Sequence, residues 1–151
     1  MGASHNIPYR DIVAKFTDAC NEHIQINSFD TGTLDYLDAS SQNTIYPYVY
    51  LRPIGSTGIS GNVRSLTFEL YSLDIPKLSQ ESPVELLSDS ETRIYDIVAY
   101  FNRGGSQQDY EVTMSAITPV NEAFNDRAFG WVSVINVLTP YKLDYCNYPK
   151  V

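Results

Sequence analysis

The strongest pattern of apolar positions lies near the C-terminal end, in Ala128–Leu138 (AFGWVSVINVL). This stretch is rich in β-branched and aromatic residues, which predicts a strand. Both alternating sets of side chains are mostly apolar, so neither face is suited to contact with water. We therefore expect an interior strand of a sheet, covered on two sides. Helices of the same chain can supply one cover, and the second is either another layer or another subunit.

Two stretches have apolar residues at helical spacing. The first begins after Asn6, a candidate helix cap, and Pro8, which is tolerated in the first turn of a helix. Its apolar stripe comprises Tyr9, Ile12, Val13, Phe16, Ala19, Cys20 and His23. The second follows a capping box at Ser88–Glu91 and has a stripe of Ile94, Ile97, Val98 and Phe101. Each helix has a single apolar stripe. Both are therefore expected on the same face of a sheet.

Several other stretches alternate with the period of a strand, and Gly, Pro, Asn and Asp separate them. We expect residues 53–62 to be a flexible hairpin loop between two antiparallel strands, and residues 140–151 to be a C-terminal tail. The predicted strands are Ile24–Ile26, Leu34–Asp38, Ile45–Arg52, Ser65–Ile75, Tyr110–Ile117 with an extension at Pro119–Glu122, and Ala128–Leu138. The order predicts one α+β domain over residues 1–151. Its sheet would be mainly antiparallel, with about four to five strands and two amphipathic helices on one face.

The net charge of −8 makes nucleic-acid binding through phosphates unfavourable, because an acidic surface repels the backbone. It does not exclude a position beside DNA, since a wall past which DNA slides without adhering would also be acidic. No apolar run approaches the roughly 18 residues that a membrane helix needs. The N-terminal residues lack a secretory signal pattern, and we expect an intracellular protein.

A search for catalytic and binding motifs gives mostly negative results. The chain has no nucleophile elbow, phosphate loop, dinucleotide fingerprint or zinc-ligand spacing. Cys20 and Cys146 are predicted to be reduced thiols, although the sequence leaves a disulfide between them open. We predict no catalytic residue, no cofactor and no metal site.

One short motif does bear on chemistry, the triplet Asp30-Thr31-Gly32. Aspartic proteases use this triplet to supply one of two carboxylates that share a proton and activate water. The sequence shows no downstream apolar-apolar-Gly strand of the kind that such a fold requires. A turn in which Asp30 and Gly32 are turn formers is therefore the preferred interpretation.

Tyrosine is unusually frequent, with 12 residues among 151. Tyrosine provides a large contact area at low entropic cost and is enriched at protein interfaces. The candidate interface residues share a strand face or lie in the tail: Tyr46, Tyr48, Tyr50, Tyr145 and Tyr148. The alternative is that each of them packs within its own subunit.

The order of these segments resembles a family of tailed-bacteriophage neck proteins, which includes tail-terminator and tail-completion proteins. The segments that carry the resemblance are the first helix ending at His23 and the stretches IQINSFDTGTLDYLD, YPYVYLRP, SLTFELYSLDI, SETRIYDIVAYFN and TPVNEAFNDRAFGWVSVINVLTPYKLDYC. The recurring features are a Tyr-Pro strand, a strand ending in Asp, a central helix and an Asp-x-x-x-Gly-Trp strand. Here these are Tyr46-Pro47, Asp74, Ser90–Asn102 and Asp126 with Gly130-Trp131.

The resemblance implies a non-enzymatic virion protein that forms a ring, a hexamer or a dodecamer, around the DNA channel at the neck or tail end. Its partners would be further copies of itself and other neck, portal or tail proteins, while DNA passes through the lumen without specific binding. The glycine-rich stretch Ile54–Gly61 would reach towards the next ring. Two other functions stay open: a small acidic adaptor acting as a monomer or dimer, and a hydrolase that uses Asp30.

Overall fold

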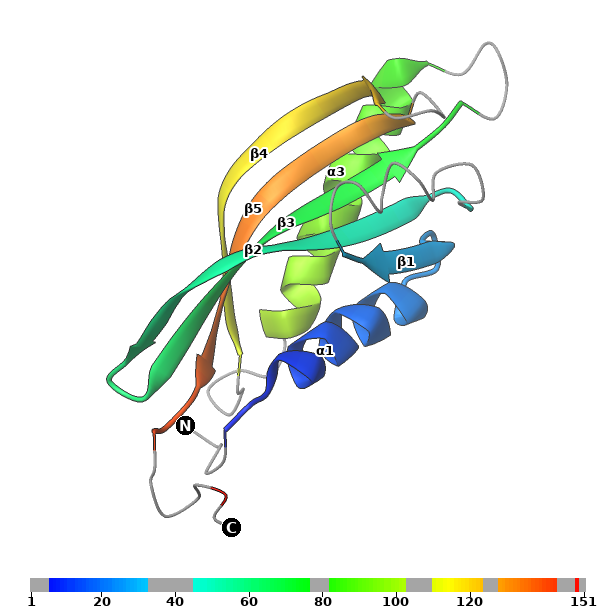
Figure 1. Ribbon diagram of the computed structural model, residues 1–151. Coiled ribbons are helices and arrows are strands. Elements are labelled where there is room, and N and C mark those ends of the chain that lie inside the picture. Colours follow the sequence, from blue (N-terminus) through cyan, green and yellow to red (C-terminus); the bar gives the residue numbers. More distant parts are fainter. Residues whose placement is uncertain are drawn as a thin grey trace.

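The computed structural model describes residues 6–32, 45–76, 82–102, 110–123, 128–143 and 149. In chain order the elements are α1 (Tyr9–Glu22), β1 (Ser28–Thr31), β2 (Tyr48–Ser60), β3 (Val63–Asp74), α3 (Pro83–Phe101), β4 (Glu111–Ala123) and β5 (Ala128–Pro140). The strands form one five-stranded sheet in the order β1-β2-β3-β5-β4. This part of the chain is therefore an α+β fold, as the sequence predicts (Figure 1).

The sheet is antiparallel except for one pair of strands. β1 runs parallel to β2, whereas β2, β3, β5 and β4 are antiparallel to their neighbours. The interior position predicted for Ala128–Leu138 is confirmed, because β5 pairs with β3 on one side and with β4 on the other. The predicted pairing of Ser65–Ile75 with Ile45–Arg52 is confirmed in β2 and β3, where Tyr50 lies opposite Tyr71.

Both helices cover the same face of the sheet (Figure 1). Their apolar stripes meet alternate residues of β2, β3 and β5 in the main core. Its fully buried centre comprises Ile12, Phe16, Val49, Leu51, Phe68, Leu70, Ile94, Ile135 and Val137. Phe16 packs against the rings of Phe68 and Phe101, with centroids 5.6 and 4.5 Å away. Such contacts join both helices and the sheet into one hydrophobic unit.

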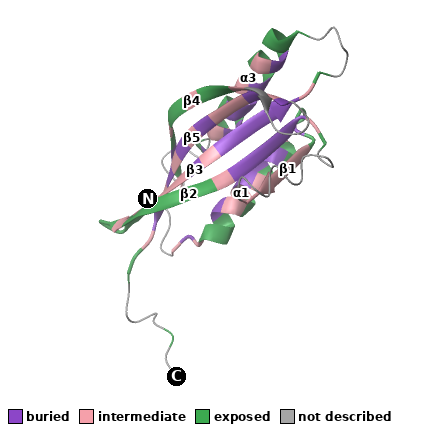
Figure 2. Ribbon diagram, turned by 45° about the horizontal axis from the view of Figure 1, so that its top comes forward, coloured by how far each residue is buried: buried purple, intermediate pink, exposed green. Residues whose placement is uncertain are grey.

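The opposite face of the sheet contains a second, smaller cluster of buried side chains. It consists of Tyr48, Tyr50, Tyr71, Leu73 and Ala128, with Tyr46, Ile75, Val120 and Val132 packed against it. Figure 2 shows this buried region along adjacent parts of β2 and β3, while the far end of the same hairpin is exposed. One end of the second face is therefore sealed within the single chain.

The prediction of a flexible loop over residues 53–62 is wrong for most of that stretch. β2 continues to Ser60, and only Gly61 and Asn62 form the turn, with φ values of 59° and 63°. A two-residue turn with both φ values positive matches the twist of an antiparallel hairpin. The other glycines are accommodated by irregularities between Pro53 and Gly55 and between Ser56 and Gly58.

The second helix begins earlier than predicted. α3 starts at Pro83, and the Ser82 side chain caps it by accepting the Val84 N–H at 3.2 Å. Proline fits the first turn because its missing N–H would have no partner inside the helix. The Ser88–Glu91 capping box is therefore inside α3, where the cap is not needed.

The strand predicted at Ile24–Ile26 is also wrong. These residues form a turn after α1, in which the Ile26 N–H bonds to the His23 carbonyl, and the strand begins at Ser28. Ile24 is 94% exposed as a result. The strand predicted at Leu34–Asp38 and most of the predicted tail, residues 144–148, 150 and 151, lie outside the described residues.

Candidate interaction surfaces

The five candidate interface tyrosines differ in how far the structure buries them. Tyr48 and Tyr50 are 3% and 0% exposed, so both are interior residues of the single chain and the interface prediction is corrected for them. Successive rings from Tyr46 to Tyr48 to Tyr50 lie 6.1 Å apart, and Tyr71 continues the row at 6.4 Å. The contacts from Tyr46 to Tyr50 run along one segment of the chain, and that between Tyr50 and Tyr71 crosses to β3; such ring contacts stabilise a sheet.

The other three candidates have different outcomes. Tyr46 is half-buried at the edge of the second cluster, so part of its side chain remains at the surface. Tyr145 and Tyr148 lie outside the described residues. The prediction that these three contact a partner stays a prediction.

The most exposed part of the sheet is the distal half of the β2–β3 hairpin, residues 53–67, here called the arm. It extends beyond both helices (Figure 1), and its β2 part is mostly exposed (Figure 2), whereas residues 64–67 of β3 are half-buried. β1 pairs with β2 only up to Leu51, and no other described strand pairs with the outer edge of β2 along the arm. Ile54 and Val63 on the arm are 49% and 36% exposed. The arm is a surface that the described part of the chain leaves uncovered.

The arm also differs in charge from the rest of the chain. Residues 53–67 and the stretch of chain beside them, residues 134–143, contain Arg64 and Lys142 and none of the 18 carboxylates of the sequence. The Arg64 guanidinium is fixed over the Tyr141 ring at 4.6 Å and donates to the Ile7 carbonyl. Lys142 is exposed. The arm therefore has no carboxylate and a single cation, Arg64, with Lys142 on the neighbouring stretch of chain.

Two strands, β2 along the arm and the edge strand β4, have features that oppose pairing with another strand. β2 has Pro53 and two irregularities within the arm. β4 has Pro119 and register shifts after Met114 and after Val120. In addition, the Asn102 side chain bonds both the N–H and the carbonyl of Val112, at 3.4 and 3.2 Å. Prolines, bulges and blocked backbone groups disfavour strand addition, so partner contacts at these edges have to use side chains.

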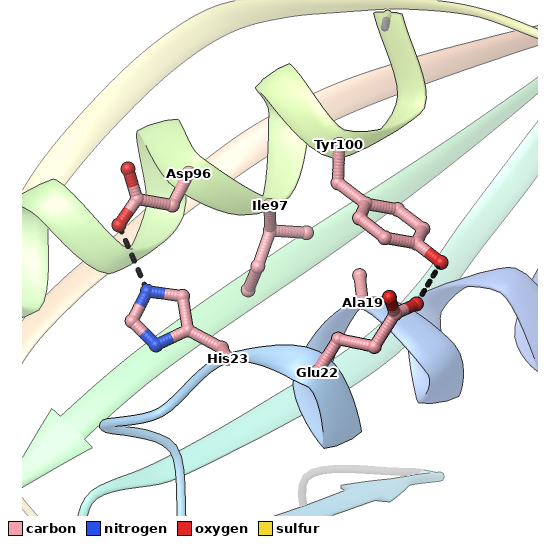
Figure 3. A pocket seen from close by; sticks show the side chains of 6 residues that line it. All are labelled: Ala19, Glu22, His23, Asp96, Ile97 and Tyr100. Carbon is pink, nitrogen blue, oxygen red and sulfur yellow. Dashed lines mark hydrogen bonds and ion pairs between the residues drawn. The ribbon is translucent and has the colours of Figure 1, made fainter.

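A shallow hollow of about 270 Å³ lies between the end of α1 and the last turns of α3. Figure 3 shows Glu22 and His23 from the α1 side facing Asp96 and Tyr100 of α3, with Ala19 and Ile97 between them. His23 Nε2 lies 2.8 Å from Asp96 Oδ2, and the Tyr100 hydroxyl donates to Glu22. These two contacts join the helices where α1 ends.

The polar contacts in this hollow hold α1 and α3 together. The Gln25 N–H donates to His23 Nδ1 at 3.1 Å, which requires an unprotonated Nδ1 and places the ring proton on the nitrogen facing Asp96. None of the six lining residues is Ser, Thr or Cys, so the His23–Asp96 pair has no nucleophile beside it. Cys20 is buried, and burial raises the pKa of its thiol to about 12, which keeps it protonated.

The Asp30-Thr31-Gly32 triplet lies at the end of β1. The Asp30 carboxylate accepts the N–H of Thr31 at 2.8 Å, and the Thr31 hydroxyl donates to the Leu51 carbonyl at 2.6 Å. The Gly32 N–H bonds to the same carbonyl at 3.2 Å. The triplet therefore fixes the end of an edge strand, and within the described ranges no hydrogen bond or ion pair joins Asp30 to a second carboxylate.

A buried polar cluster between α3 and β3 was not predicted. Arg93 and Asp74 are each 4% exposed, with Nη1 and Oδ2 3.8 Å apart, and Ser90 and Ser72 are fully buried. Arg93 Nη1 lies 3.5 Å from the Ser90 hydroxyl, while its Nε has no hydrogen-bond partner. Residues 90, 93, 94 and 97 follow helical spacing, so the position of Arg93 on the apolar stripe is the sequence signal that would have revealed this cluster.

Two further properties concern ligands and membranes. Within the ranges that the structure describes, no group of three His, Cys, Asp or Glu residues could hold a metal ion. No described helix is long and apolar enough to cross a membrane.

No protein-family model matches the chain, and no curated protein matches it.

Proposed function

We propose that this chain is a structural virion protein of a tailed bacteriophage, which forms a ring around the DNA channel at the head–tail neck or at the tail end. The proposal begins from the resemblance of the sequence segments and gains support from the roles that the resembling residues have in the fold. Its partners would be further copies of the chain, in a hexamer or dodecamer, and neighbouring neck, portal or tail proteins.

The Gly-Trp pair of the resemblance has a definite structural role in β5. A Cβ atom at Gly130 would lie 1.8 Å from the Ser72 carbonyl oxygen, so this position requires glycine. The Trp131 indole N–H donates to the Leu87 carbonyl at 2.8 Å and so attaches β5 to α3. Asp74, the acidic strand end of the resemblance, faces Arg93 of α3. Asp126 lies outside the described residues.

The observation that carries the proposal is the exposed arm. A hairpin that presents Ile54 and Val63 to solvent, beyond the body of its own domain, has apolar surface suited to a partner. A monomeric function does not require such a projection. The acidic composition is compatible with a channel wall, because DNA would be repelled by the remaining surface.

The test is the mass and shape of the purified chain. Light scattering after size exclusion, followed by negative-stain microscopy, should give a discrete ring of six or twelve chains or an assembly that forms on addition of a neck or portal ring. A DNA mobility-shift assay at physiological salt should give no specific complex. A chain that stays monomeric and joins neither a partner ring nor a virion would refute the proposal.

The second candidate, a small acidic adaptor acting as a monomer or dimer, is favoured by the second cluster. Tyr48, Tyr50 and Leu73 are almost fully buried in the single chain, so that end of the second face does not need a partner to exclude water. The same light-scattering experiment separates the two functions, because an adaptor would remain a monomer or dimer at every concentration.

A further inference from the structure

We propose that the arm of one copy docks, head to tail, on a surface at the opposite end of the next copy, here called the acceptor surface. The acceptor surface comprises Ile24, Ile45, Glu22 and Asp96. The inference rests on the ring proposed above and names the two surfaces by which its copies would meet. Three observations carry it: apolar exposure at both surfaces, complementary charge, and the distance between them within one chain.

The acceptor surface is a coherent patch at the end of α1. Ile24 and Ile45 are 94% and 63% exposed, the first and fourth largest such values among the exposed large hydrophobic residues described. They belong to adjacent segments, because the Ser28 hydroxyl donates to the Ile45 carbonyl and the Asn27 side chain to that of Tyr46, at 2.8 Å. Each of these exposed isoleucines gains solvation free energy if a partner covers it.

The charges of the two surfaces are opposite. Glu22, two residues before Ile24, and Asp96 place carboxylates beside the hollow of Figure 3, and the Asp96 side chain is 48% exposed. The arm and its β5 flank contain Lys142 and Arg64 without a carboxylate. A basic apolar projection is therefore complementary to an acidic apolar patch, which favours encounter in one orientation.

The geometry excludes docking within one copy. The acceptor surface adjoins the start of β2, whereas the arm contains the far end of the same strand (Figure 1). β2 has 13 residues, about 40 Å at ~3.3 Å per residue, and Ile54 lies about 20 Å along it from Tyr48. A rigid, paired hairpin cannot turn back over that length, so the occupant has to be a second chain. Because the two surfaces differ, the contact is heterologous and leads to a ring when the rotation closes.

The sheet edges favour this side-chain contact over backbone pairing. A symmetrical contact between two β2 edges or two β4 edges would have to accommodate Pro53 or Pro119 and two register shifts on each strand. In the arm, the shift between Pro53 and Gly55 leaves Ile54 unpaired, with its side chain 49% exposed. Ile54 is therefore the residue that we expect to contact the acceptor surface most directly.

The experiment uses two variants of the full chain, alone and mixed. The arm variant is Ile54→Glu with Val63→Glu, the acceptor variant is Ile24→Lys with Ile45→Lys, and Val84→Glu is the matched control, since Val84 is 70% exposed in the first turn of α3. Urea unfolding establishes that each is folded. We expect rings from the wild type and the control, monomers from each interface variant alone, and a 1:1 dimer on mixing, because one intact arm then meets one intact acceptor.

The other outcomes each overturn the inference. Rings from the arm variant would remove the arm from the interface and leave the proposed function standing. Rings from the acceptor variant with monomers from the arm variant would indicate an arm-to-arm contact. Two monomeric variants whose mixture gives no dimer would place the lost contact elsewhere. A wild type that is monomeric at every concentration would count against both the docking and the self-assembled ring.

Discussion

Gly130 offers the sharpest test of the fold, because its substitution by alanine has a cost that the structure allows to be estimated. A Cβ atom at residue 130 would lie 1.8 Å from the Ser72 carbonyl oxygen and 3.0 Å from the Leu73 Cα. Ordinary contacts begin near 3.4 Å. Since both obstacles are backbone atoms of β3, β3 and β5 must separate locally by more than an ångström.

The loss of stability can be estimated from the interactions that are broken when β3 and β5 separate. Leu73 pairs with Gly130 and Ser72 with Trp131, so about two backbone hydrogen bonds are lost, at ~1 kcal/mol each. Overpacking adds about 1–3 kcal/mol. The lower entropy of the unfolded alanine variant offsets about 0.4–1 kcal/mol. We therefore expect Gly130→Ala to reduce the free energy of unfolding by about 2–4 kcal/mol, a large share of the 5–15 kcal/mol typical of a domain.

Urea unfolding followed by tryptophan fluorescence measures this loss. With a slope of about 2 kcal/mol per molar urea, the midpoint should fall by about 1–2 M. Gly55→Ala is the matched control, because a Cβ atom there meets nothing within 4 Å. Its midpoint should stay within about 0.3 M of the wild type, given a change of about 0.5 kcal/mol for an exposed site. An unchanged midpoint for Gly130→Ala would refute the close approach of the two strands.

Three further predictions concern buried groups. Arg93→Met should lower the free energy of unfolding by about 3–5 kcal/mol, because it leaves the Asp74 carboxylate buried without its cation, and adding Asp74→Asn should recover part of that loss in the same urea assay; full stability of the single variant would contradict the pairing. In a Cys146→Ser variant, Cys20 should not react with a disulfide reagent at pH 8 until the protein unfolds, because burial raises the pKa of its thiol to about 12; rapid reaction of the folded protein would contradict its burial. Burial, together with Glu69, raises the pKa of Tyr71 from 10.0 to about 12, so its contribution to stability is complete below pH 10 and is lost as the pH rises through 12. The stability of Tyr71→Phe should therefore fall less than that of the wild type above pH 10, and equal slopes would contradict the assignment.

The sequence determined the fold class and the two pairings between consecutive antiparallel strands, β2 with β3 and β4 with β5, but not the pairing of β3 with β5 or the parallel pairing of β1 with β2. Periodicity in α1, β3, β4 and β5 was sufficient, since each of these elements buries a face whose period matches its secondary structure. The interior position of β5 followed from apolar residues on both of its faces. Two of the wrong sequence predictions concern proline and glycine. Pro83 was not recognised as the start of α3, and the glycines of residues 53–62 were assigned to a loop, although pairing with β3 keeps most of them in β2.

Which surfaces are exposed to solvent could be determined only from the tertiary structure. Tyrosines such as Tyr48 and Tyr50 are typical of interfaces, yet these two are buried in the second cluster of the same chain, whereas Ile24 in a turn and Ile54 at a bulge are exposed. The partner of Arg93 was equally hidden, because Asp74 lies 19 residues earlier and only the packing of α3 on β3 brings the two together. Periodicity indicates which side of a helix or strand is apolar. Whether that side is exposed depends on what packs against it, and such packing involves residues far apart in the chain.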